Sequence, residues 1–141
     1  MPISNFVKFY AFPENLGKAK IDFSTHVFKV AFTNTAPALT NAILADITQI
    51  ATTGGYINGG YLLDGVIWSA SVGVGKLVIT DEVITATGGS VGPFRFFVIY
   101  DDTDPNDILI GYYDYGSSVT LADTESFALD FDGANGVWTL T

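Results

Sequence analysis

Alternating apolar and polar positions mark the first clear β-strand of this chain. In the segment 26–34, Phe28, Val30 and Phe32 fall on one side of an extended backbone, because successive side chains point to opposite faces. The segment 91–100 is apolar on both sides, which is typical of a central strand covered on both faces. The two segments therefore predict a sheet with a buried middle.

The two sides of the segment 91–100 differ in their residues. They are expected to carry Phe94, Phe96, Val98 and Tyr100 against Arg95, Phe97 and Ile99.

Further short apolar runs are separated by glycine-rich or polar turns. Such runs lie at 66–72, 76–80, 83–87, 108–116, 118–122, 126–131 and 137–140. The pair Asn135-Gly136 favours a tight turn before the last of them. We expect a mainly β fold, a β-sandwich or a jelly-roll-like domain, with residues 14–141 forming a single sandwich domain.

One segment has a helical rather than an alternating pattern. Between positions 33 and 55, Leu39, Ile43, Ile47 and Ile50 recur at steps of three to four residues. The spacing predicts one short amphipathic helix, ended by the glycines at 54 and 55.

The N-terminal segment 1–13 is rich in aromatic residues and ends at Pro13. Two interpretations are open. The segment is either an extended arm that reaches a partner or the first strand of the core.

Composition limits the chemistry available to this chain of 141 residues. It has no cysteine and one histidine, His26, so disulfides, thiolate sites and histidine-rich zinc sites are excluded within one chain. Any mechanism that needs an imidazole depends on His26, which is expected at a strand edge without a catalytic role. Hydrophobic residues make up 48% and charged residues only 15%, which favours a surface partly covered by other protein.

Charge is unevenly distributed along the sequence. The net charge of −9 argues against nucleic acid and membrane surfaces as partners. Lys8, Lys18, Lys20 and Lys29 all lie near the start, whereas every charge after Arg95 is acidic. The asymmetry indicates either a basic face for an acidic partner or a charge that only keeps the molecule soluble.

The most acidic stretch follows the central strand. Asp102, Asp104 and Asn106 match the first three ligands of an EF-hand loop, but the sixth and twelfth positions are Asp107 and Tyr113 instead of Gly and Glu. Because Asp and Asn side chains bond nearby backbone amides, we expect a polar hairpin loop, with a looser calcium site as the alternative. A solvated loop does not raise the pKa of one acid as a glycosidase requires, so no enzyme activity is expected.

Aromatic residues offer an alternative function in carbohydrate binding. Tyr113 and Tyr115 share a side of the strand that follows the acidic loop, and they are the candidates for an exposed aromatic patch. Core packing is the competing interpretation.

Three segments carry a family resemblance. They are FKVAFTNTAPALTNAILADITQIA, GGSVGPFRFFVIYDDTDPNDILIGYYDYGSS and FALDFDGANGVWTL. As a set they resemble small virion structural proteins of tailed bacteriophages, over residues 28–140 with a variable stretch near 61–87.

The resemblance implies a role in the virion. A capsid decoration (cement) protein is the first expectation, and a tail or fibre component or a carbohydrate- or receptor-binding sandwich is the alternative. It further implies synthesis in the host cytoplasm, a place on the capsid surface, the major capsid protein or another virion protein as partner, a homotrimer, and no cofactor or metal. The shell contact would be the N-terminal aromatic and basic residues Phe6, Lys8, Phe9, Tyr10, Phe12, Lys18 and Lys20.

Overall fold

The strands predicted from alternation form three antiparallel sheets in the computed structural model, which describes residues 5–141. The strands are β1 (Val7–Lys8), β2 (Phe28–Thr33), β3 (Tyr61–Leu62), β4 (Ile67–Ser71), β5 (Val74–Val78), β6 (Glu82–Thr85), β7 (Val91–Asp101), β8 (Ile108–Leu121), β9 (Ser126–Leu129) and β10 (Trp138–Leu140). The helical elements are α1 (Phe12–Gly17) and a 3-10 turn, η1 (Leu44–Asp46).

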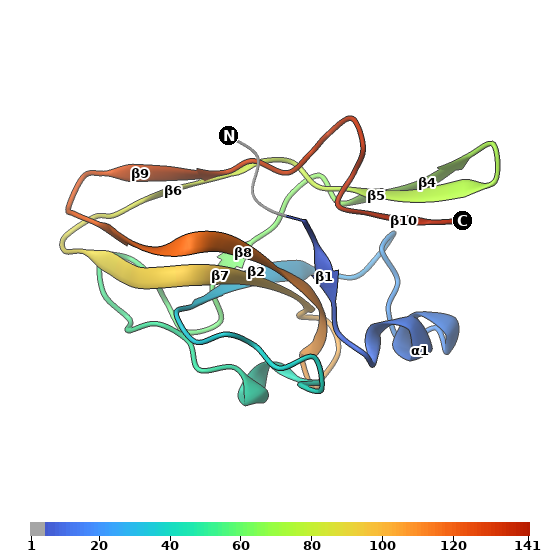
Figure 1. Ribbon diagram of the computed structural model, residues 1–141, viewed down its shortest axis with the longest axis horizontal. Helices are drawn as coiled ribbons and strands as arrows, with labels where there is room; N and C mark the ends of the chain where they lie inside the picture. The colour runs from blue at the N-terminus through green and yellow to red at the C-terminus, as the bar shows by residue number, and fades with distance from the viewer. Residues whose placement is uncertain (1–4) are drawn as a thin grey trace.

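The sheets are arranged in two layers. One layer is a five-stranded sheet of order β1-β8-β7-β2-β3, and the other contains the three-stranded sheet β10-β5-β4 and the two-stranded sheet β6-β9 (Figure 1). This arrangement confirms the predicted mainly β, sandwich-like fold with one short α-helix.

The main core lies between these layers and is rich in aromatic rings. Phe32 on β2 is fully buried, and its ring centroid lies 4.8 Å from that of Phe94 and 4.9 Å from that of Phe97. Phe28 and Val30 point into the same core, as the alternation predicted. Pairs of rings at such distances add about 0.5–1.5 kcal/mol each beyond the burial of their area.

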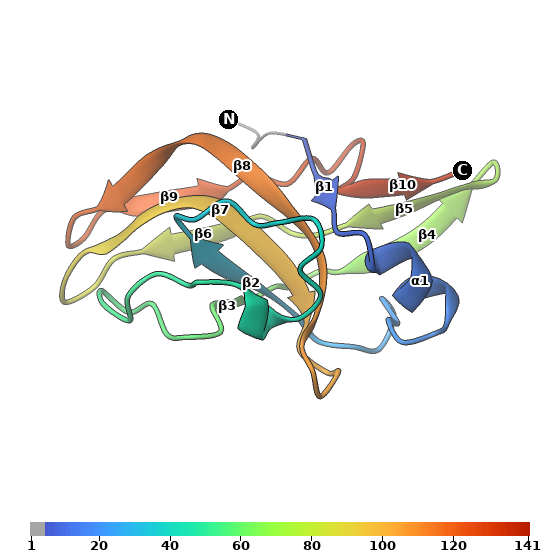
Figure 2. The ribbon, with the colours of Figure 1, turned by 60° about the horizontal axis from the view of Figure 1, so that its bottom comes forward.

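The opposite face of the five-stranded sheet is covered as well. A second buried cluster contains Val98 and Tyr100 of β7 and Leu109 of β8. The connection from β2 to β3 passes over this face and places Ile47 on it (Figure 2). The central strand is therefore buried on both sides, as predicted.

The predicted helix over 33–55 is wrong. The only helical piece there is the turn η1, flanked by extended backbone at Ile43 (φ −133°) and Ile47 (φ −98°). The Asp46 carboxylate accepts hydrogen bonds from the backbone amides of Ala42 and Ile43, at 2.9 and 3.2 Å. Such local bonds compete with the helix, so the apolar residues pack on the sheet one by one.

The α-helix lies instead at Phe12–Gly17, where the sequence pattern did not predict one. Pro13 does not end a segment here. It occupies the first turn of the helix, where its missing N–H costs nothing and its fixed φ favours the helical backbone.

One side chain of β7 faces the other way from its predicted neighbours. The pairing of β7 with β8 shifts between Phe94 and Phe96, where extra residues of β8 bulge around Gly116 (φ 94°). The irregularity turns Phe94 into the main core with Phe97, whereas Phe96 lies near Tyr112 on the other face.

Candidate functional site

The acid-rich segment is a hairpin loop between β7 and β8, as predicted. Its aspartates bond the backbone of the loop itself. Asp101 accepts from the amide of Thr103 at 3.0 Å, and Asp104 accepts from the amide of Asn106 at 2.8 Å. These two carboxylates therefore shape the turn.

One acid of this segment is not solvated, which corrects the expectation from sequence. Asp101 is fully buried at the end of β7, and its Oδ2 lies 2.6 Å from Nδ1 of His26. His26 lies two residues before β2 in a half-buried position, so the pair links the segment that leads into β2 to the end of the adjacent strand β7. This contact, together with the backbone amide of Asp22 at 3.4 Å from the same ring nitrogen, fixes the orientation of the imidazole.

A second pair of contacts connects the same loop to the residue after His26. The amide of Val27 donates to the Thr103 hydroxyl at 2.7 Å, and the Val27 carbonyl accepts from the amide of Asp102 at 2.8 Å. The loop is thus held against the entry to β2 by both side chain and backbone.

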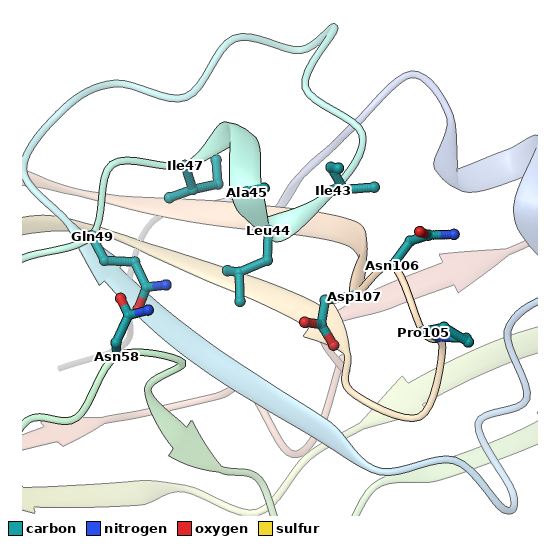
Figure 3. Close-up of a pocket in the computed structure, with 9 residues that line it drawn as sticks. All are labelled: Ile43, Leu44, Ala45, Ile47, Gln49, Asn58, Pro105, Asn106 and Asp107. Carbon is teal, nitrogen blue, oxygen red and sulfur yellow. The ribbon is translucent and has the colours of Figure 1, made fainter.

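A groove of about 500 Å³ lies beside this loop, on the face covered by the β2–β3 connection (Figure 3). Its lining combines apolar, amide and carboxyl side chains from three separate segments. The lining residues are Ile43, Leu44, Ala45, Ile47, Gln49, Asn58, Pro105, Asn106 and Asp107.

The side chain of Gln49, at one end of the groove, is fixed by two hydrogen bonds. Its Oε1 accepts from the Tyr56 hydroxyl at 2.7 Å and from the Gly59 amide at 2.8 Å. Burial raises the pKa of Tyr56 to about 12, so the phenol remains a donor at neutral pH. The Tyr56 oxygen also accepts from the amide of Phe32, which ties the groove to β2.

Asp107 at the other end has an unusual environment. Its backbone adopts a left-handed conformation (φ 52°), and its carbonyl accepts from the Leu44 amide at 3.0 Å. Burial, and then the charge of Asp102, raise the pKa of the Asp107 carboxyl above its usual value. It is the one ionisable side chain in the lining, so the groove offers hydrogen bonds to a polar ligand rather than a pair of acids.

The aromatic residues of the predicted shell contact divide into buried and exposed ones. Phe9 and Phe12 are fully buried, which corrects their assignment as apolar anchors for a partner. Phe6 lies over Gly111 of β8, where an added Cβ would come within 2.1 Å of the ring. Tyr10 is 68% exposed and is the one ring of this group that faces solvent.

The basic residues of the same prediction are all exposed. Lys8 lies on β1, and Lys18 and Lys20 follow α1. Lys18 forms an ion pair with Glu14 at 2.5 Å. The hydrogen bond and the charge of Lys18 lower the pKa of the Glu14 carboxyl, and the charge of Lys20 contributes less. The segment 1–4 of the predicted arm lies outside the described residues, and residues 7–8 form the short strand β1, which pairs with β8.

The predicted exposed patch of Tyr113 and Tyr115 is not present. Tyr113 is 5% exposed, and its ring lies between Phe6 and Phe131, at 5.5 and 5.9 Å. Tyr115 packs edge-on against Phe127 at 5.2 Å in the main core. Core packing, the competing interpretation, is correct for both.

Two features of the site were not identified from sequence. The pair of His26 and Asp101 joins residues 75 positions apart, and nothing local in the sequence marks that contact. The groove combines three loops, and the sequence indicates ligand binding only at the loop containing Asp107, as a looser calcium site.

The described residues form neither a membrane-spanning helix nor a cluster of metal-ligating side chains. No helix within residues 5–141 has the length and apolar character to cross a bilayer. In that part of the chain, three or more histidine and acidic side chains do not converge at a place where they would hold a metal ion.

Comparisons with known proteins give no assignment. No protein-family model, no curated protein and no solved structure matches this chain.

Proposed function

We propose that this chain is a structural protein of a bacteriophage virion, and that it decorates the capsid by binding the shell through its basic N-terminal face. The observation that carries the proposal is the joint exposure of Lys8, Tyr10, Lys18 and Lys20 on a chain whose net charge is −9. We call these four residues the N-terminal face. The family resemblance supports the same role.

The N-terminal face is built on buried residues, which favours a rigid contact. Phe9 lies in the second buried cluster and Phe12, the first residue of α1, lies in the main core, so the exposed side chains between and beyond them start from fixed backbone. A preorganised surface loses less entropy on binding than a disordered arm would.

The lysines suit an acidic partner. Lys18 is paired with the solvent-exposed Glu14, and an exposed pair of this kind contributes little to stability. Lys18 can therefore leave Glu14 and pair with an acidic residue of the shell at little cost in free energy. The acidic residues elsewhere on the chain are repelled by an acidic shell, so they orient the basic end towards it.

Binding itself would be the function in this proposal. A decoration protein stabilises the shell to the extent that it binds the assembled shell better than the free subunits. Particles without it are expected to rupture at a lower temperature than particles that carry it.

The test reverses the charge of the N-terminal face. A triple variant Lys8→Glu, Lys18→Glu and Lys20→Glu is compared with the matched triple Lys→Arg variant in co-sedimentation with capsids that lack the protein. We expect the Glu variant to lose affinity by at least about tenfold and the Arg variant to bind as the parent does. Equal binding by both, with both folded by circular dichroism, would refute the proposal.

A receptor- or carbohydrate-binding role is the second candidate, because of the groove in Figure 3. Amide groups at both of its ends and the Asp107 carboxyl at one of them, with Leu44 in between, suit the hydroxyls and the apolar face of a sugar. Binding on a glycan array that is lost in Asn58→Ala, an exposed lining residue, and kept in Ser117→Ala on β8 would support this role. An array without any signal would leave the shell contact as the sole candidate.

A further inference from the structure

The three-stranded sheet ends in an open edge. In the order β10-β5-β4, the strand β4 has β5 on one side and no strand of the described chain on the other. The β4–β5 hairpin extends at one end of the molecule, away from the loops of the groove (Figure 1). We call Ile67–Ser71 the β4 edge.

The turn of this hairpin determines which backbone groups face outward. Val72 and Gly73 both have positive φ, at 52° and 76°, as in a two-residue turn whose flanking pair is hydrogen-bonded. Hydrogen-bonded pairs alternate along an antiparallel ladder, so Ser69 bonds to β5 while Trp68 and Ala70 do not. The N–H and C=O groups of Trp68 and Ala70 therefore point away from the sheet.

The β4 edge has none of the features that keep edge strands apart. Between Asp64 and Lys76 the chain has no ionisable residue and no proline, whereas native edges are usually protected by such residues. Ile67 is 56% exposed and Val72, at the tip of the hairpin, is 99% exposed. A β-branched residue is rarely found with the positive φ of Val72, where Asn or Gly fits better. The tip of the hairpin nevertheless carries an apolar side chain.

The edge is also rigid. Trp68 packs over Gly75 of the neighbouring strand, where an added Cβ would lie 2.7 Å from the indole. The indole stacks on Trp138 at 5.8 Å and lies 5.5 Å from Phe23. A strand held by these contacts is already in the conformation that pairing requires.

We infer that the β4 edge pairs with the β4 edge of a second copy of this chain. Two antiparallel copies related by a two-fold axis at Ser69 would place Trp68 opposite Ala70 of the other copy. Both residues direct their backbone groups outward, so this register forms hydrogen-bonded pairs on each side of the axis. The two three-stranded sheets then become one continuous sheet.

The absence of charge at the β4 edge permits a second copy as the occupant. Each copy has a net charge of −9, so most of its surface repels another copy, but the stretch from 65 to 75 carries no charge. The side chains also fit in this register, because the large Trp68 faces the small Ala70 and the exposed Val72 lies next to Val66 of the second copy. The contact is self-complementary, as a two-fold interface must be.

This inference does not depend on a role in the virion. It also differs from the homotrimer expected from the resemblance, since antiparallel pairing of two identical edges gives a two-fold contact and not a three-fold one.

The first experiment changes the residue on the axis. Ser69→Glu places two like charges directly opposite each other, whereas Ser69→Gln has the same size without the charge. Sedimentation of the parent and the Gln variant, at concentrations up to about 1 mM, is expected to show a dimer. The Glu variant is expected to have a dissociation constant raised at least tenfold, and an equal mixture of Ser69→Glu and Ser69→Lys is expected to restore pairing.

The second experiment uses the absence of cysteine from the chain. Ser69 lies in a non-hydrogen-bonded pair with its own copy in the proposed register, where Cα atoms are about 4.5 Å apart, within the range for a disulfide. Ser69→Cys is therefore expected to form a covalent dimer on mild oxidation. Ser117→Cys, an exposed serine on β8, is the control that should remain a monomer.

The outcomes separate clearly. A concentration-dependent dimer that Ser69→Glu disrupts and Ser69→Cys traps supports the pairing. A monomer at every concentration, a trimer, or a dimer unaffected by Ser69→Glu would overturn it, whatever the capsid experiment shows.

Discussion

Replacing Phe12 with alanine tests whether the aromatic N-terminal segment belongs to the core or is a separable arm. Phe12 is fully buried, and its ring lies edge-on to Trp138 at 4.8 Å and to Phe23 at 6.2 Å. Phe12 therefore connects the start of the chain to its last strand.

The expected loss is large relative to the stability of a domain. Truncating a buried Phe to Ala costs about 3–5 kcal/mol, and two lost ring contacts place Phe12 in the upper part of that range. Domains are stable by about 5–15 kcal/mol in total. A loss near 4 kcal/mol corresponds to a fall in Tm of about 10–20 °C for a chain of 141 residues.

Urea unfolding followed by tryptophan fluorescence measures this effect, because Trp138 contacts Phe12 and stacks on Trp68. The midpoint should fall while the slope m stays constant, since the surface exposed on unfolding hardly changes. Tyr10→Ala is the matched control. Tyr10 lies two positions earlier and is 68% exposed, so its removal should change stability by less than about 0.5 kcal/mol.

The reasoning fails if Phe12→Ala and Tyr10→Ala have equally small effects on unfolding. In that case the segment would not be part of the core, and deleting it would leave a folded domain.

Three further changes test the groove and its loop. Tyr56→Phe leaves the buried amide of Phe32 without its acceptor and should cost about 1–3 kcal/mol in urea unfolding. Asp107→Asn should raise Tm at pH 7, because a raised pKa means that the ionised carboxyl of Asp107 destabilises the fold above its usual pKa. The gain should vanish below about pH 3, where the carboxyl is protonated in both the folded and the unfolded chain. Asp101→Asn should cost about 1.5–3 kcal/mol, because a charge-assisted bond to the imidazole is lost, and a Tm equal to that of the parent would contradict the burial of this pair.

The strands could be predicted because their periodicity reflects a local geometric rule. In β2, alternation placed Phe28 and Phe32 on the core side, and the structure agrees. In β7 the same rule failed at Phe94, because the bulge depends on extra residues of β8 opposite it, and alternation within one strand contains no information on its partner.

The misplaced helix has a different physical cause. Apolar residues at steps of three to four fit a helix, but they also fit an irregular chain whose residues pack singly, as Ile47 and Ile50 do. The Asp46 side chain favours the irregular chain over the helix, because it bonds the backbone amides just before η1. Pairing of His26 with Asp101 depends on the complete sheet and was not predictable from either segment.

The order of strands in the large sheet has a consequence for synthesis of the chain. β1 pairs only with β8, and β2 pairs with β7, so the first strands made must wait for the hairpin of residues 91–121. At about 5–20 residues per second, Phe9 and Phe12 remain without the surfaces that bury them for on the order of 10 s after they leave the ribosome. In the opposite layer, β5 pairs with β10 (Trp138–Leu140). That layer therefore also depends on a strand that is synthesised late. The five-stranded sheet is therefore not expected to form until β8 has been synthesised, and chains truncated before β8 should be recovered with chaperones or in aggregates.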